Sequence, residues 1–147
     1  MIRRAQIADL PQLAQLFDDY RVFYRKDSDL SAANDFIKER MLAEESVIFV
    51  HESGSDITGF TQLYPIFSST SMRRIWLLND LYIKPDFRGR GISKELIEAA
   101  KEHSRQTNAS GLLLETEKAN KIGNRLYPSV GFELNEETNY YWWENKE

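Results

Sequence analysis

Cysteine is absent from this chain of 147 residues. Its absence excludes disulfide bonds, thiolate metal sites and a cysteine nucleophile, and it suits a reducing compartment. Histidine is scarce as well: His51 and His103 stand far apart in the sequence, so we expect no metal site. No apolar run has the length of a membrane span, and we see no signal peptide, so we expect a cytoplasmic protein with no membrane partner.

The chain also lacks a strong charge of one sign. Its 19 basic and 23 acidic side chains give a formal net charge of −4, and no basic block stands out, so nucleic acid is not an expected partner. The chain is 41% hydrophobic and 12% aromatic, which indicates a folded globular protein. Because we find no repeat and no linker, we predict that residues 1–147 form one domain with its own core.

The spacing of apolar residues predicts a mixed α/β fold around one sheet. Asp9 and Ser31 are expected to cap the first two helices, and Pro65 with the serines after it is expected to end a strand. The predicted helices cover residues 9–22, 31–42, 91–107 and 120–129, and the predicted strands cover residues 1–4, 47–50, 57–66, 73–83 and 111–115, with two closing strands at Phe132 and at residues 139–143.

The most informative segment is a turn that reads Arg88-Gly89-Arg90-Gly91-Ile92-Ser93. It lies between an apolar strand and a predicted helix. Glycines at such a junction let the backbone pass close to a ligand, and the N–H groups at the start of the helix point at that ligand. The turn therefore suits a pyrophosphate, and its two arginines add positive charge.

The turn and a second motif carry a resemblance to a known family. The turn resembles the pattern Gln/Arg-x-x-Gly-x-Gly/Ala, from which Ser93 departs, and the second motif resembles Asn-x-x-Ala-x-x-x-Tyr-x-x-x-Gly-Phe at Asn120, Gly123, Tyr127 and Gly131-Phe132. With the order of elements, they make the chain similar to the GNAT superfamily of acetyl-CoA-dependent N-acetyltransferases. The resemblance implies a mostly antiparallel sheet of six or seven strands, with splayed central parallel strands and about four helices. Because glycine stands where alanine is usual, the last helix should be less stable here.

The resemblance implies acetyl-CoA as the cofactor and indicates which residues would bind it. The turn would hold the pyrophosphate, a strand segment would pair with the pantetheine arm, and the second motif would contact the cofactor from the opposite side. A backbone N–H near Leu81 is then a candidate oxyanion donor. The expected cofactor-binding residues are Leu81, Tyr82, Ile83, Arg88, Gly89, Arg90, Gly91, Ile92, Ser93, Lys94, Asn120, Asn124 and Tyr127.

Two proton transfers require catalytic groups. Tyr127 is the candidate general acid, because a phenol with a pKa of about 10 can share a proton with a departing thiol whose pKa is about 8.5. The alternative for Tyr127 is a packing role. The base is open. Asn79 stands where diamine-type relatives have glutamate, and Asp80 is expected on the opposite face of the strand, where its role could be structural. Our hypothesis is a chain of water molecules that ends near Asp80 or Asn79.

The family also places the acceptor pocket beside the end of the first helix and the start of the central strand. The candidate substrate-binding residues are Arg21, Tyr24, Arg25, Arg73 and Arg74. An arginine there could bind a substrate carboxylate, which would favour an amino acid or short peptide over a polyamine. The alternative for each arginine is an ordinary surface position.

The resemblance thus implies transfer of an acetyl group to a primary amine of a small molecule, amino acid-like or polyamine, by direct attack in a ternary complex. One alternative is a protein lysine or N-terminal acetyltransferase. Another is a non-catalytic acyl-CoA-binding regulatory module, which Asn79 favours and Tyr127 argues against. Trp142 and Trp143, in the last predicted strand, would suit the core or a homodimer contact.

Overall fold

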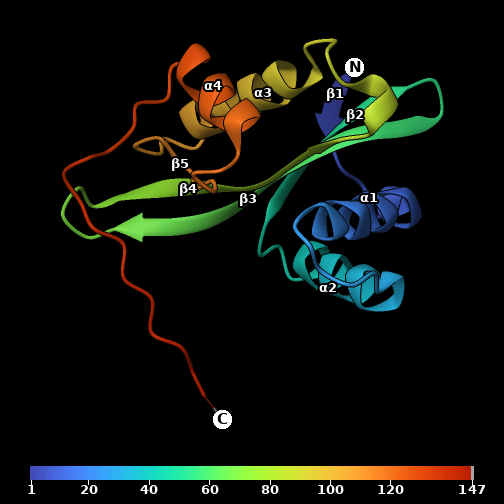
Figure 1. The fold of residues 1–147 in the computed structure, drawn as a ribbon, viewed down its shortest axis with the longest axis horizontal. Coiled ribbons are helices and arrows are strands. Elements are labelled where there is room, and N and C mark those ends of the chain that lie inside the picture. The colour runs from blue at the N-terminus through green and yellow to red at the C-terminus, as the bar shows by residue number, and fades with distance from the viewer. Residues whose placement is uncertain (147) are drawn as a thin grey trace. The chain divides into compact units, whose positions relative to one another are not determined.

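The computed structural model describes residues 1–146, which fall into two compact units, one over Met1–Glu115 and one from Thr116 onward. The first unit holds one five-stranded sheet in the order β1-β2-β3-β4-β5, with α1 and α2 on one face and α3 on the other (Figure 1). Its strands are β1 (Ile2–Arg4), β2 (Val47–Ser53), β3 (Asp56–Ser68), β4 (Arg73–Ile83) and β5 (Leu112–Leu113), and its helices are α1 (Leu10–Phe23), α2 (Leu30–Leu42) and α3 (Ile92–Gln106). The second unit holds α4 (Lys121–Ser129).

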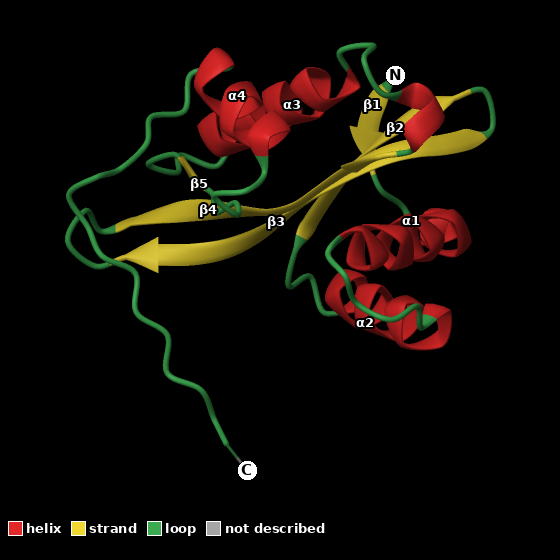
Figure 2. Ribbon diagram, viewed as in Figure 1, coloured by secondary structure: helices red, strands yellow, loops and turns green. Residues whose placement is uncertain are grey.

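The predicted fold class is confirmed. Among residues 1–146, four α-helices and a mostly antiparallel sheet appear where apolar periodicity placed them, and only the β4–β5 pair is parallel (Figure 2). In the first unit, the helices form because apolar residues recur on one face of each helix and are buried in the core beside the sheet. On α1 this face carries Leu10, Leu13, Ala14, Leu16 and Phe17. No helix of the described residues is both long and apolar enough to cross a membrane.

The sheet has five strands, and the predicted six or seven is wrong. Residues 133–146 form no strand, and Phe132 lies outside any strand. The predicted strand over residues 111–115 shortens to Leu112–Leu113. Aromatic residues such as Tyr141 and Trp142 favour strands only where a neighbouring strand supplies hydrogen bonds and packing, so the pattern alone does not make one.

Three local predictions also need correction. Asp9 stands at the start of α1, but its carboxylate accepts no bond from that helix and binds Arg3 instead. The cap of α2 is Asp29, which accepts from the N–H of Ala32 at 3.1 Å, so the predicted cap at Ser31 is wrong. Strand β3 continues through Pro65, because pairing with β2 has already ended at Leu63 and the missing N–H leaves no gap in that ladder.

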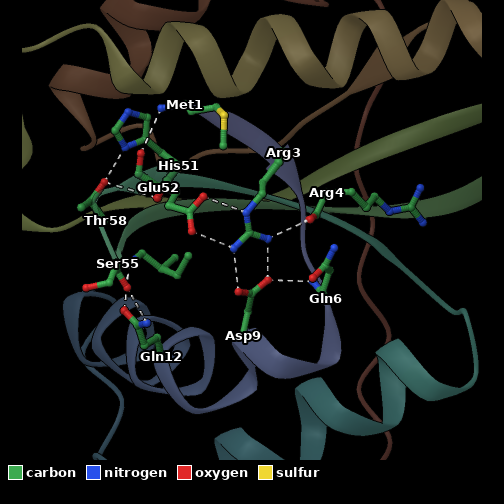
Figure 3. A network of polar contacts seen from close by, with 11 residues as sticks. Met1, Arg3, Arg4, Gln6, Asp9, Gln12, His51, Glu52, Ser55 and Thr58 are labelled. Carbon is green, nitrogen blue, oxygen red and sulfur yellow. Dashed lines mark hydrogen bonds and ion pairs between the residues drawn. The ribbon is translucent and has the colours of Figure 1, made fainter.

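A polar network joins the first strand to its neighbours (Figure 3). The guanidinium of Arg3 donates two bonds of 2.8 Å to the carboxylate of Asp9, and its Nε lies 3.1 Å from Glu52 on β2. The hydrogen bonds from Arg3 hold the pKa of Asp9 below its usual value. This pair therefore ties β1 to the segment that leads into α1.

Replacing Arg3 with methionine should lower the free energy of unfolding at pH 7 by about 2 kcal/mol, since bonds to a charged partner are lost. Because the pKa of Asp9 is lowered in the folded protein, the stabilisation is present above the unfolded pKa and is lost as pH falls through the folded one. Urea unfolding at several pH values checks this: the gap between wild type and R3M should close below about pH 4. The control Arg4→Met, at an exposed neighbouring position, should show a smaller and pH-independent change; equal effects would contradict the assignment.

Candidate functional site

Strand β4 is covered on only part of one edge. The parallel ladder with β5 pairs Trp76 with Leu112 and Leu77 with Leu113, and it ends there. On its other edge, β4 pairs with β3 as far as Ile83. Within the described residues, no strand pairs with the β5 side of β4 over residues 78–83. The two parallel strands therefore part after Leu77, as the predicted splay requires.

The alternation of an antiparallel ladder tells which backbone groups face this open edge. The N–H of Lys84 donates to the carbonyl of Thr58 at 2.8 Å, so Lys84 and every second residue before it bond toward β3. The intervening residues, Leu81 and Ile83, turn their backbone N–H and C=O groups to the open edge. An extended ligand arm that carries amide groups can pair with such an edge as a strand would.

The glycine turn follows β4 directly. Both glycines have left-handed backbones, with φ of 77° at Gly89 and 81° at Gly91, a conformation that favours glycine. Helix α3 begins at Ile92, and the N–H of Glu95 donates to the carbonyl of Gly91 at 3.1 Å. The N–H groups of residues 92–94 precede this bond and have no acceptor within the helix. The predicted glycine turn is thus present at the start of a fifteen-residue helix, and its binding of an anion stays a prediction.

The two arginines of the turn bind protein groups in this structure. Arg88 donates from Nε to the carbonyl of Ile83 at 2.9 Å, and its guanidinium lies 5.2 Å from the ring centre of Tyr82. Arg90 donates to the carbonyl of Asp86 at 3.1 Å and lies over the ring of Phe87. Both cations therefore stay beside the turn and raise the local positive potential, while Arg88 also covers one carbonyl of the open edge.

Replacing Gly91 with alanine should weaken acetyl-CoA binding about tenfold or more, because alanine disfavours the left-handed backbone by roughly 1–2 kcal/mol and the turn would shift. Calorimetric titration with acetyl-CoA measures this. Gly54→Ala is a matched control, because Gly54 has φ of 62° in the β2–β3 hairpin and should alter stability without altering that affinity. Equal affinities for wild type and G91A would exclude the turn as the binding element.

A buried carboxylate lies on β4 immediately before the open-edge residues. Asp80 is only 2% exposed, and burial raises its pKa, while hydrogen bonds from Gln62 and Asn79 oppose that rise. The Asn79 amide donates to one carboxylate oxygen at 2.9 Å and Gln62 donates to the other. A carboxylate whose pKa is raised by burial binds a proton more tightly than an exposed one, which makes Asp80 a candidate proton acceptor.

The structure corrects the expected geometry of Asn79. It was predicted to face away from Asp80, as neighbours on a regular strand do. The β3–β4 register shifts between Gln62 and Leu63, which pair with Asp80 and Leu78, so Asn79 is the extra residue of a bulge. The bulge lets its side chain reach Asp80, and its carbonyl accepts a 3.1 Å bond from the hydroxyl of Tyr20 on α1.

In the second unit, the two predicted asparagines hold the start of α4. Asn120 accepts from the N–H of Gly123 at 3.1 Å and donates to Thr116 at 2.9 Å, and Asn124 donates to the carbonyl of Asn120 at 2.8 Å. A Cβ on Gly123 would stand 2.5 Å from the Asn120 amide nitrogen, so glycine makes room for this cap. Both asparagines thus have a structural role, and their contact with a cofactor stays a prediction.

Tyr127 lies in the last turn of α4 and packs edge-on against Phe132, with ring centres 5.8 Å apart. The N–H of Phe132 also donates to the carbonyl of Tyr127 at 3.0 Å. These two contacts explain the spacing of the motif, because the Gly131-Phe132 end folds back on the tyrosine. They fix the ring and leave the role of the hydroxyl as a prediction.

The five predicted acceptor residues do not form one group. Tyr24 packs edge-on against Tyr20, whose hydroxyl reaches Asn79, so this aromatic residue lies near the β4 bulge. Arg21 and Arg73 donate to the carbonyl of Asp27 and to the side chain of Asn108, respectively. Arg74 lies over Trp76, and Arg25 has a left-handed backbone with φ of 66°.

Distance along β4 separates part of this set. Arg74 is six residues before Asp80, roughly 20 Å along a strand. Arg73 and Arg74 are therefore remote from the buried carboxylate, and an acceptor role for any of the arginines remains a prediction.

Sequence reasoning missed Gln62, Ser46 and Tyr20, which surround Asp80 and Asn79. Gln62 is fully buried and links Ser46 to Asp80, with a 2.8 Å bond from the serine hydroxyl. The available signal was a glutamine in the middle of an apolar strand, which requires a polar partner.

Comparisons with known proteins show which family the chain resembles. The sequence model described as the Acetyltransferase (GNAT) family matches residues 10–132. An uncharacterized N-acetyltransferase of Bacillus subtilis, YhfO, is 46% identical over 90% of this chain and 89% of its own. A thialysine N-epsilon-acetyltransferase of Sus scrofa is 33% identical over 53% of this chain and 45% of its own. The crystal structure of a probable acetyltransferase superposes with a TM-score of 0.94 at 33% identity, covering 100% of this chain and 99% of that one.

Proposed function

The chain belongs to the GNAT family of acetyltransferases and uses acetyl-CoA as its acetyl donor, and on that premise we propose that its acceptor is a primary amine of a small molecule, amino acid-like or polyamine. The observation that carries the proposal is the arrangement of one stretch of β4. Buried Asp80 is followed at once by the open-edge residues Leu81 and Ile83, and the glycine turn comes next. The family match spans both units, which supports a single catalytic domain.

Acetyl-CoA, when bound, supplies an activated thioester. Residues 88–94 would hold its pyrophosphate through backbone N–H groups, and the open edge over residues 81–83 would pair with its amide-bearing arm. The N–H of Leu81 would donate to the carbonyl oxygen on which negative charge develops. The acyl group would then lie beside the Asn79 bulge and the buried carboxylate.

The chain's own ionisable groups would then move two protons. An alkylammonium has a pKa of about 10.4, so the acceptor arrives protonated and must lose a proton before it attacks. Asp80 would receive that proton through a chain of water molecules that ends near Asn79, and Tyr127 would donate one to the departing thiolate. The amine attacks directly, within a ternary complex.

Two alternatives predict different results. A relative is named as a thialysine N-epsilon-acetyltransferase, which supports an amino acid-like acceptor for this chain over a protein lysine or N-terminus. Asn79, in place of the glutamate of diamine-type relatives, would suit a regulatory module that binds acetyl-CoA without turnover. The buried carboxylate beside it supports catalysis.

A panel of polyamines, free amino acids, lysine-containing peptides and basic proteins tests the proposal. Each is incubated with acetyl-CoA, thiol release is followed, and the acetylated product is identified by mass spectrometry. We expect turnover with at least one small primary amine. Turnover with peptides and proteins alone would favour the protein acetyltransferase, and tight binding of acetyl-CoA with no turnover would favour the regulatory module.

We propose further that the chain acts in the cytoplasm as a homodimer, joined through its C-terminal aromatic residues. The side chains of Tyr140 to Trp143 are largely exposed, at 75% for Trp142 and 81% for Trp143. Four buried aromatic side chains contribute about 150–250 Å² each, which approaches the roughly 800 Å² per partner of a stable interface.

Light scattering after size exclusion should therefore give twice the chain mass of 17.2 kDa. The double variant Trp142→Ser, Trp143→Ser should elute as a monomer. The control Met72→Ser, at a position that is 89% exposed in the β3–β4 turn, should remain dimeric. A monomeric wild type would refute the dimer.

A further inference from the structure

Gln62 is a fully buried amide in the middle of β3. A buried amide without partners costs free energy, so its hydrogen bonds determine why the position is polar. Its Oε1 accepts from the hydroxyl of Ser46 at 2.8 Å, and its Nε2 donates to the carboxylate of Asp80. Ser46 is itself buried and stands just before β2, so three segments distant in sequence meet at one amide.

The chemistry of these partners fixes the orientation of the amide. An ionised carboxylate only accepts hydrogen bonds, so the nitrogen of Gln62 must face Asp80 and its oxygen must face away. The hydroxyl of Ser46 stabilises that orientation by donating to the oxygen. Ser46 and Asp80 therefore hold the amide from both ends.

We propose that Gln62 is a positioning residue that keeps the Asp80 carboxylate ionised and correctly oriented, and that Ser46 in turn orients Gln62. The proposal rests on the proposed function, in which Asp80 receives the proton of the amine. The new element is that Asp80 on β4 can act as a base only while the neutral amide of Gln62, on the neighbouring strand β3, donates to it.

The surroundings of Asp80 make this donor important. Its carboxylate accepts hydrogen bonds from the amides of Gln62 on β3 and Asn79 on β4, and the hydroxyl of Tyr20 on α1 donates to the carbonyl of Asn79 beside it. The charge of Asp80 also acts on Tyr64 of β3. Burial raises the pKa of that phenol, the charge of Asp80 raises it further, and the charge of Arg40 on α2 opposes the rise. Burial raises the pKa of Asp80 as well, and the bond from Gln62 is the first of the contacts that lower it.

The direction of the effect follows from this balance. Without the hydrogen bond from Gln62, less opposes the rise in the pKa of Asp80 that burial causes, so Asp80 should bind its proton more tightly. A base works only when deprotonated, so the acid limb of kcat/KM should move to higher pH. Gln62→Met keeps the side-chain length and removes the amide. In this variant we expect the acid limb of kcat/KM to move up by about one pH unit, which is a tenfold loss of rate on the acidic side of the profile. Ser46→Ala should cause a smaller shift of the same sign.

Two readouts test the proposal. The first is the titration of the Asp80 carboxyl carbon by NMR in the full chain without substrates, and the second is the pH profile of kcat/KM with an amine found in the panel. Thr58→Val is the control, because Thr58 is equally buried on β3 but bonds His51. It should lower thermal stability and leave both titrations unchanged.

The outcomes separate this proposal from the proposed function. An unchanged titration of Asp80 in Q62M and S46A would overturn the role of Gln62, even if Asp80→Asn shows that Asp80 is the base. If Asp80→Asn leaves the pH profile unchanged, the proposed base fails and the catalytic role of Gln62 fails with it. The carboxyl titration then still reports whether Gln62 controls the ionisation of Asp80. Should Q62M not fold, S46A alone decides, because it alters the same bond from the far side.

Discussion

Replacing Tyr127 with phenylalanine should lower kcat by about 10²- to 10³-fold while acetyl-CoA affinity stays within about twofold of wild type. The substitution removes only the hydroxyl. The ring keeps its edge-on contact with Phe132, and the Phe132 N–H still donates to the Tyr127 backbone, so the end of α4 should remain folded. A selective loss of kcat is the signature of a group that acts on the departing thiolate and not on binding.

Steady-state kinetics with a panel substrate and calorimetry with acetyl-CoA measure the two quantities for Y127F. Tyr140→Phe is the matched control, because it removes the same hydroxyl from an exposed tyrosine and keeps the ring that the proposed dimer contact uses. It should leave both quantities unchanged. A kcat for Y127F close to that of wild type would remove Tyr127 from the mechanism, and a parallel loss of affinity would indicate a binding role.

Replacing Asp80 with asparagine should lower kcat/KM at pH 7 by about 10²-fold, and the deficit should shrink as pH rises. The wild-type rate increases with pH through the pKa of Asp80, which burial raises. At high pH more of the amine is already neutral, so the base is needed less. Asn79→Ala should have a smaller effect, since Asn79 donates to Asp80 and has no carboxylate of its own.

The pH dependence that Asp80 gives to stability should have the opposite sign to the one that it gives to activity. A carboxyl whose folded pKa is raised loses stability as pH rises from its unfolded pKa through its folded one. A neutral amide in place of the Asp80 carboxylate does not titrate, so the free energy of unfolding of D80N should not show this fall with rising pH. Asp35→Asn, at an exposed position on α2, should change neither rate nor stability. A rate deficit for D80N that is constant from pH 7 to pH 10 would exclude Asp80 as the base.

The elements that the sequence predicted well are those whose signals are local. Helix α3 begins at Ile92, within one residue of its predicted start. This start could be predicted because the glycines before it and the apolar face of the helix are local features of the sequence. Strand β4 has the predicted bounds for a related reason, an apolar run of strand length. The closing strands failed because a strand exists only with a partner, and the residues of 139–143 carry no information about whether one is present.

The same distinction applies to the site. The glycine turn was predictable because positive φ at Gly89 and Gly91 and the start of α3 are properties of a few consecutive residues. The approach of Asn79 to Asp80 was not, because it depends on a bulge created by the register against β3. Gln62 was missed for the same reason, since its partners lie 16 and 18 residues away. Arg21 and Arg73 bond to Asp27 and Asn108, six and 35 residues away, and periodicity reveals neither partner.

Assignment of backbone amide signals by NMR, before and after saturation with coenzyme A, tests the central claim most directly. The account predicts that the signals of residues 89–94 move, together with those of Leu81 and Ile83, whose N–H groups face the open edge of β4. The signals of Asp80 and Tyr82, which bond toward β3, should move less. Saturation that leaves the turn and the open edge unmoved, with shifts confined to other strands or helices, would contradict it.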